Sequence, residues 1–82
     1  MAGSFKTDIL PMFRPVDIDH MRPMGILLDD YAWMSKPDNA KGVYARLSGE
    51  ETPRIPPRGP YWNAAQLQKF SDWMNVEPTY QR

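Results

Sequence analysis

The sequence predicts an all-α fold, a small bundle of about four short helices joined by long proline-rich loops. Apolar residues recur every three or four positions in several segments, which is the spacing of one helix face. Nine prolines and five glycines punctuate the chain between these segments. The apolar run at 24–28 could form a strand, but it has no second strand with which to pair. We therefore expect this run to be a buried connector between helices.

A chain of 82 residues is expected to form one domain. We place this single helical domain at residues 1–75 and a flexible C-terminal tail at 76–82. The tail carries no helical pattern, and chain ends without packing partners fray.

Two helical segments are expected near the N-terminus. The first runs from Ser4 to Phe13, with Ser4 as its N-cap. Pro11 has no backbone N–H, so this helix should be irregular or end early. The second is a short helical turn over 17–22, capped by Asp17 and stopped by the following proline. The apolar face of the first segment consists of Phe5, Ile9, Met12 and Phe13.

Two further helices are expected in the middle of the chain. A short helix capped by Asp29 or Asp30 ends before Pro37. A longer helix spans about 39–47, and Gly49 after it is suited to a left-handed C-cap.

The clearest helical pattern spans 63–75, where Asn63 and Gln66 have the spacing of a capping box. Its buried face is expected to consist of Leu67, Phe70, Trp73 and Met74. Neither this apolar stripe nor that of the first helix can be buried without a partner, so we expect the two helices to pack together. The contacts would join Phe70 and Trp73 to Phe5, Ile9 and Phe13.

Charge and composition argue against several classes of function. Ten Lys and Arg balance ten Asp and Glu, for a formal net charge of 0. The arginines are scattered among acidic residues, so no basic face for nucleic acid is expected. The chain has no cysteine, which removes thiolate catalysis, disulfides and cysteine-ligated metals. No phosphate-binding glycine loop or nucleophile motif occurs, and we expect the chain not to be an enzyme.

The same composition bears on localisation and assembly. No apolar run approaches the ~20 residues of a membrane span, and the N-terminus lacks the apolar core of a signal peptide. We therefore expect a soluble, cytoplasmic protein with no membrane partner. A net charge near zero favours association, so a protein partner is expected, in a homo-oligomer or a hetero-oligomer.

The loop over 53–62 is the expected partner-binding surface. Its prolines pre-order an extended backbone from which Arg54, Arg58 and Tyr61 project. Arg and Tyr are typical interface anchors, and a pre-ordered backbone loses less entropy on binding. The structural alternative is a rigid loop that closes the core, because prolines in loops restrict the unfolded chain.

His20 is the only histidine of the chain. The simplest interpretation is a surface imidazole beside Asp17 and Asp19. However, His20, Met21 and Met24 also place three soft or borderline donors within five residues, a set that suits copper or haem iron. A small metal- or haem-binding redox protein that uses His20 with Met21 or Met24 is therefore the alternative function.

Several segments occur in the order found in small bacterial cytochrome c-like domains. They are 8–13, 16–20, 25–31, 43–49 and Ile55-Pro56-Pro57. Over roughly residues 5–75 the chain resembles this family. The resemblance implies the arrangement of a cytochrome c, in which the N-terminal and C-terminal helices cross.

Each departure from the family falls on a haem-binding position. His20 matches the haem-ligating histidine, whereas Val16 and Asp19 replace the two cysteines that attach haem. Ile55 replaces the methionine ligand. The resemblance therefore implies a cytochrome c-like scaffold that has lost its haem and carries no cofactor. We interpret the chain as a non-catalytic accessory domain that docks on a larger bacterial protein or enzyme.

Overall fold

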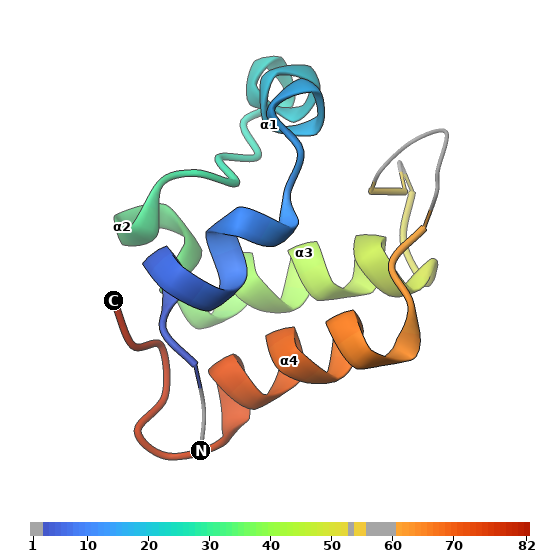
Figure 1. Ribbon diagram of the computed structural model, residues 1–82. Coiled ribbons are helices and arrows are strands. Elements are labelled where there is room, and N and C mark those ends of the chain that lie inside the picture. The colour runs from blue at the N-terminus through green and yellow to red at the C-terminus, as the bar shows by residue number, and fades with distance from the viewer. Residues whose placement is uncertain (1–2, 53, 56–60) are drawn as a thin grey trace.

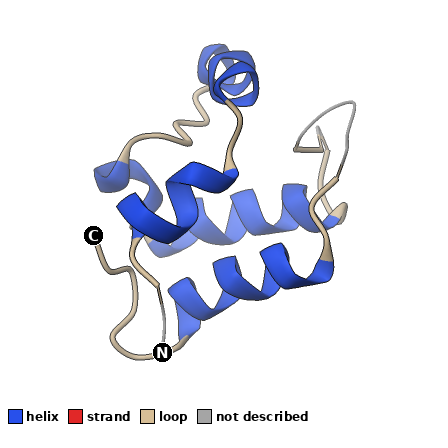
Figure 2. Cartoon of the chain, in the orientation of Figure 1, coloured by secondary structure: helices blue, strands red, loops and turns tan. Residues whose placement is uncertain are grey.

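Four α-helices, one π-helical segment and two 3-10 segments build the described part of the chain (Figures 1 and 2). The computed structural model describes residues 3–52, 54, 55 and 61–82. In chain order the elements are η1 (Phe5–Ile9), η2 (Leu10–Met12), α1 (Pro15–Met21), η3 (Arg22–Met24), α2 (Tyr31–Met34), α3 (Pro37–Ser48) and α4 (Ala64–Asn75). No strand occurs among these residues, so the prediction of an all-α fold is confirmed.

The first helical segment is irregular, as its proline predicts. The Ser4 hydroxyl accepts a hydrogen bond from the Thr7 N–H and caps η1. The N–H groups of Ile9 and Leu10 each bond to a carbonyl five residues back, which makes η1 a π-helix. Pro11 has no N–H with which to continue this pattern, and η2 tightens around it into a 3-10 turn.

The helix α1 begins earlier than the sequence predicts. Pro15 occupies its first position, where the missing N–H has no intrahelical partner to lose. Arg14 is the N-cap, and Asp17, which was expected to be the cap, lies in the first turn. The helix passes directly into η3, and Gly25 ends η3 in the left-handed region with φ 80°.

The later helices keep their predicted caps, except that α3 begins at Pro37, about two residues before the predicted start, with Lys36 as its N-cap. Asp30 caps α2 by accepting a hydrogen bond from the Trp33 N–H. Gly49 ends α3 in the left-handed region with φ 91°. Asn63 and Gln66 form the predicted capping box at the start of α4, with both reciprocal hydrogen bonds present.

The two longest helices form the base of the structure. In Figure 1, α3 and α4 lie side by side and run antiparallel. The segment η1 packs on α4, and α2 packs on α3. The arm formed by α1 and η3 projects away from the α3–α4 pair, at the top of Figure 1.

Ring contacts between the first and last helical segments build the core. The Phe5 ring lies 5.6 Å from the Trp73 ring, and the Phe70 ring also lies 5.6 Å from it. Phe70 and Trp73 are fully buried, and Ile9 and Phe13 belong to the same buried cluster. The predicted packing of the last helix on the first is therefore confirmed, with direct ring contact at Phe5.

The C-terminal segment 76–82 packs against the core and is not the frayed tail that the sequence predicts. The Tyr80 ring lies 5.1 Å from the Trp73 ring. The Trp73 indole N–H donates to the Gln81 carbonyl at 2.8 Å, and the Phe5 N–H donates to the same carbonyl at 2.8 Å. These contacts make the segment part of the folded domain.

Replacing Trp73 by alanine is expected to lower the free energy of unfolding by about 3–5 kcal/mol. The substitution removes a fully buried ring and leaves a cavity among its aromatic neighbours. Thermal and urea unfolding followed by circular dichroism measures the loss. The exposed Val76→Ala is the control, with an expected change within about 0.5 kcal/mol. Wild-type melting of Trp73→Ala would show that this packing is wrong.

Removing residues 80–82 is expected to lower the free energy of unfolding by about 1–3 kcal/mol, because the buried Trp73 N–H then loses its acceptor. The matched control is Gln81→Ala, which keeps the accepting backbone carbonyl and should unfold like the wild type. Urea unfolding of the wild type, the truncated chain and Gln81→Ala measures these free energies of unfolding. If the truncated and complete chains unfold identically, the segment does not stabilise the domain and is a frayed tail.

Candidate functional site

The loop residues that the sequence assigns to partner binding are partly brought together by the fold. Tyr61 is 46% exposed and Arg54 is half-buried. The guanidinium carbon of Arg54 lies 3.7 Å from the centroid of the Tyr61 ring, a cation–π distance. Arg58, the third of these residues, lies outside the described residues.

Gly49 provides the room for the Arg54 side chain. A Cβ atom at Gly49 would lie 2.9 Å from the guanidinium carbon, so the guanidinium rests against the glycine backbone. The next residue, Ile55, is 1% exposed, and its N–H donates to the Arg46 carbonyl at 3.1 Å. The described part of the loop therefore also closes the core, as the structural alternative predicts, while it holds Arg54 against Tyr61.

The surface beside Tyr61 contains a hollow of about 330 Å³, which we name the Tyr61 hollow. Three parts of the chain form it: the end of η2, the start of α1 and the residues that begin α4. Its volume lies at the lower end of the range for pockets that bind small ligands or single side chains. The lining residues are Met12, Arg14, Asp17, Tyr61, Trp62, Asn63 and Gln66.

Trp62 gives the Tyr61 hollow an apolar wall. Its ring lies 5.0 Å from the Phe13 ring and 6.2 Å from the Phe70 ring, so the core fixes its orientation. Trp62 and Met12 are only partly buried, and both remain accessible at the hollow. The wall is therefore rigid and available to an apolar group.

Arg14 and Asp17 form a bidentate ion pair that lines the same hollow. Arg14 donates from Nε and Nη2 to the two carboxylate oxygens of Asp17, at 2.7 and 3.1 Å. Asp17 is 7% exposed and is the buried charged side chain of the described chain. Hydrogen bonding to the Asp17 carboxylate raises the pKa of Arg14 above its ordinary value. The pair is therefore a fixed structural element of the wall.

A second hollow, of about 380 Å³, lies where the N-terminal residues meet α4. The Asp8 carboxylate in its wall accepts hydrogen bonds from the Ser4 N–H and the Thr7 hydroxyl, and these bonds lower the pKa of Asp8. Gln68 donates to Asp72 at 2.8 Å. Several polar groups of this second hollow are thus already hydrogen-bonded within the chain, and none of the described residues that line it is aromatic. We therefore regard the Tyr61 hollow as the stronger candidate site.

Of the alternative metal ligands, the structure separates Met21 from the other two. His20 and Met24 are exposed, whereas the Met21 side chain is fully buried in the core. Consecutive helix residues do not face each other, so Met21 cannot share an ion with His20 and is not retained as a ligand. Among the residues of the described ranges, no group of three or more His, Cys, Asp or Glu side chains could hold a metal ion.

Haem does not fit the residues that match its ligands in the cytochrome c resemblance. Val16 is 63% exposed and Asp19 is exposed, at the positions where the family has cysteines. Ile55 is an apolar side chain buried in the core, while His20 is exposed on α1. Neither hollow described above is lined by His20 or Ile55. Among the described residues, those that match haem ligands therefore do not line either hollow as a ligand pair.

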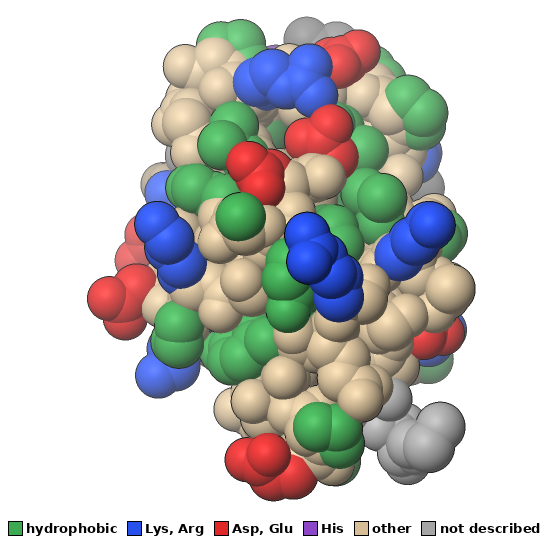
Figure 3. Space-filling view, turned by 90° about the vertical axis from the view of Figure 1, so that its left-hand side faces the viewer, with side chains coloured by type: hydrophobic (Ala, Val, Ile, Leu, Met, Phe, Trp, Pro, Cys, Tyr) green, Lys and Arg blue, Asp and Glu red, His purple; other side chains and the backbone are tan. Residues whose placement is uncertain are grey.

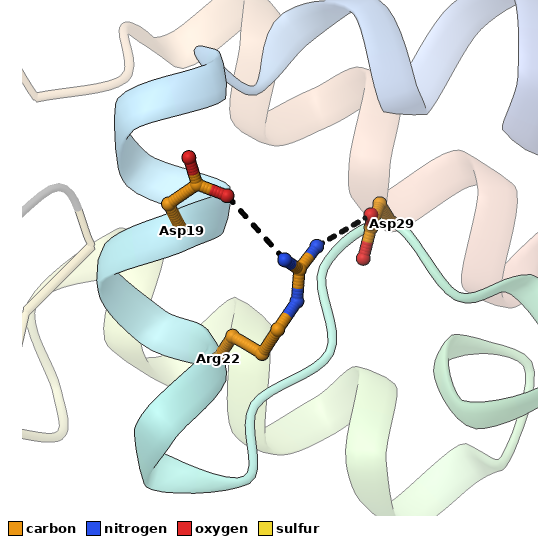
Figure 4. A network of polar contacts seen from close by, with 3 residues as sticks. All are labelled: Asp19, Arg22 and Asp29. Carbon is orange, nitrogen blue, oxygen red and sulfur yellow. Dashed lines mark hydrogen bonds and ion pairs between the residues drawn. The ribbon is translucent and has the colours of Figure 1, made fainter.

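Arg22 connects the α1–η3 arm to the loop that follows it. Its guanidinium donates to Asp29 at 2.9 Å and to Asp19 at 3.4 Å (Figure 4). All three side chains are exposed, so these ion pairs contribute little to stability.

Acidic and basic side chains alternate on the face shown in Figure 3, and no broad basic area is visible there. That face lacks the basic stripe of a nucleic-acid-binding surface. Within the described ranges, no helix has the length and apolar character that crossing a bilayer requires.

Sequence reasoning named Arg54 and Tyr61 as candidate residues but did not predict the Tyr61 hollow beside Tyr61. Arg14 and Asp17 carry a usable signal, because opposite charges three residues apart at a proline-started helix face each other. The approach of α4 to these residues has no local signal, since it depends on how distant segments pack.

Comparison with known proteins does not place the chain in a family. No protein-family model, no curated protein and no solved structure matches it. Function must therefore be inferred from the residues themselves.

Hemin added to the purified protein is expected to give no sharp, saturable shift of its Soret band, because the residues frame no porphyrin pocket. Visible absorption titration measures this, with His20→Ala as the matched control. The two proteins should give the same background spectrum. A sharp Soret shift that disappears in His20→Ala would contradict this expectation and support the redox alternative.

Proposed function

We propose that this chain is a non-catalytic protein-binding domain that docks on a larger protein through Tyr61 and the hollow beside it. The observation that carries the proposal is the half-exposed Tyr61 ring, which the Arg54 guanidinium contacts at 3.7 Å at the edge of the Tyr61 hollow. Tyr, Trp and Arg are the residues most enriched among interface anchors. Arg58 belongs to the same proposed surface by its place in the loop.

The rigidity of this surface supports a docking role. Trp62 is held by ring contacts with Phe13 and Phe70, and Arg54 is held by Gly49 and Tyr61. Each rotamer-rich side chain that must be ordered on binding costs about 0.5–1.5 kcal/mol. Side chains that folding has already ordered avoid much of this cost.

The proposal includes a cytochrome c-like scaffold without haem. The ring contact between Phe5 and Trp73 joins the first and last helical segments, as expected for crossing terminal helices. The buried Ile55 supports the loss of the methionine ligand. The docking role rests on the Tyr61 surface and stands without this relationship.

Replacement of Tyr61 by the photo-crosslinking residue p-benzoylphenylalanine is expected to capture one discrete protein from an extract of the source cells. The reason is that the ring at this position would lie inside the proposed interface. The matched control carries the same residue at Val76, which is 41% exposed, lies just after α4 and does not line the Tyr61 hollow. Gel mobility and mass spectrometry identify the products.

The captured partner then separates docking from core closure. Tyr61→Ala should weaken its binding by about 2 kcal/mol or more while the melting temperature stays close to that of the wild type. The same product from both crosslinking positions, or no product from Tyr61, would contradict the proposal. Normal partner binding by a Tyr61→Ala protein that melts early would show that the loop is structural.

A further inference from the structure

The segment 79–82 is joined to the core through three successive backbone carbonyls, those of Tyr80, Gln81 and Arg82. Their donors belong to η1, α2 and α4, so one short segment is tied to three elements. The donors are the N–H groups of Phe5 and Lys6, the Tyr31 hydroxyl and the Trp73 indole N–H. Because the three carbonyls follow one another along the backbone, a movement that breaks one of these bonds is expected to break the others.

One aromatic side chain anchors this segment. The Tyr80 ring is partly buried and packs edge-on against the Trp73 ring, at 5.1 Å between centroids. The side chains of Gln81 and Arg82 are exposed, and the guanidinium carbon of Arg82 lies 5.2 Å from the Tyr31 ring centroid. A partly buried ring and an exposed cation–π contact stabilise less than the fully buried side chains of the core. The segment is therefore held more lightly than the helices on which it lies.

The chain that leads into this segment has the features of a hinge. It turns back after α4 (Figure 1), and the four residues from Asn75 to Pro78 are exposed in succession. Tyr80 has φ 52°, in the left-handed region that residues other than glycine seldom adopt. This conformation costs free energy while the segment is docked, and release of the segment removes the cost. The exposed residues can reorient without disturbing buried side chains.

The helices under the segment have contacts of their own that do not involve it. Trp73 packs against the rings of Phe5 and Phe70, which lie in η1 and α4. The Ser4 hydroxyl caps η1, and the Ser4 N–H donates to the Asp8 carboxylate at 2.8 Å. Once the segment leaves, water can accept from the donors that it uncovers. Departure of the segment therefore does not require η1 or α4 to unfold.

From these observations we infer that residues 79–82 form a strap that opens from the core as one unit while the α3–α4 pair stays folded. The closed strap engages the Trp73 indole N–H and the Tyr31 hydroxyl, and the open strap releases both to solvent. The strap follows the end of α4, whereas the Tyr61 hollow is lined by residues at the start of that helix. This conformational device therefore does not depend on the proposed function.

Native-state hydrogen exchange of the complete chain, followed by ¹H–¹⁵N NMR, tests the strap. Three strap reporters, the N–H groups of Phe5 and Lys6 and the Trp73 indole N–H, should have protection factors within about threefold of one another, because they share one local opening. These should lie at least about tenfold below the protection factor of the Phe70 N–H inside α4. Low urea should lower the Phe70 value alone, since a local opening exposes little surface. Unequal strap reporters, or reporters with the protection and urea dependence of Phe70, would overturn the inference.

Leu47→Val separates opening of the strap from unfolding of the whole domain. Leu47 is fully buried in the last turn of α3, which lies beside the start of the antiparallel α4 and not beside the end that leads into the strap. Shortening this side chain should lower the protection factor of the Phe70 N–H about fivefold. The three strap reporters should change by less than about twofold, and an equal fall in all four would overturn the inference. The urea series makes the same separation in the wild type, so the decision does not depend on how well the variant folds.

Tyr80→Ala tests the anchor of the strap, because it removes the ring and keeps the accepting carbonyls. It should lower the protection factors of the three strap reporters together, by about tenfold. Gln81→Ala is the matched control, since it removes an exposed side chain from the neighbouring residue and should change these values by less than about twofold. Unchanged protection in Tyr80→Ala, or an equal fall in Gln81→Ala, would show that the ring does not hold the strap and would overturn the inference.

Discussion

The indole ring of Trp73 has no exposed surface, and rings from three parts of the chain contact it. Phe5 comes from the first helical segment, Phe70 from the same helix, and Tyr80 from the C-terminal segment. The indole N–H is satisfied by the Gln81 carbonyl. Because a buried donor without an acceptor costs about 1–3 kcal/mol, burial of this ring favours the return of the chain end to the core. An 82-residue chain buries a limited share of its surface, so an aromatic residue that joins both ends to α4 has a large effect.

The same ring cluster extends to the candidate site. Trp73 contacts Phe70, Phe70 contacts Trp62, and Trp62 contacts Phe13. Trp62 is the member of this series that lines the Tyr61 hollow. The apolar wall of the hollow is therefore continuous with the core, and its orientation depends on the packing that stabilises the domain. A change at Phe70 or Phe13 would alter the site without touching a ligand.

Local sequence signals predicted most of the helices, because caps act over three or four residues. Asn63 with Gln66 and Gly49 at the end of α3 are examples. The C-terminal segment was predicted wrongly, since its partner Phe5 lies far away in sequence. Met21 was misjudged for a related reason: only tertiary packing shows that its side chain enters the core while His20 stays outside. For the same reason the sequence predicted the residues of the loop but not the hollow that α1 and α4 form beside it.

Stability and binding are not separate alternatives for the loop after α3. Ile55 is buried, and its N–H bonds to the Arg46 carbonyl, which ties the loop to α3. The neighbouring Arg54 is thereby held at Gly49, where the absence of a Cβ lets the guanidinium rest against the backbone. A long flexible side chain such as arginine loses up to about 2 kcal/mol of rotamer entropy when it is fixed. Here folding bears that loss before any partner arrives, because the contacts with Gly49 and Tyr61 already order the side chain. The loop that closes the core through Ile55 is therefore also the loop that holds the Arg54 guanidinium against the exposed Tyr61 ring.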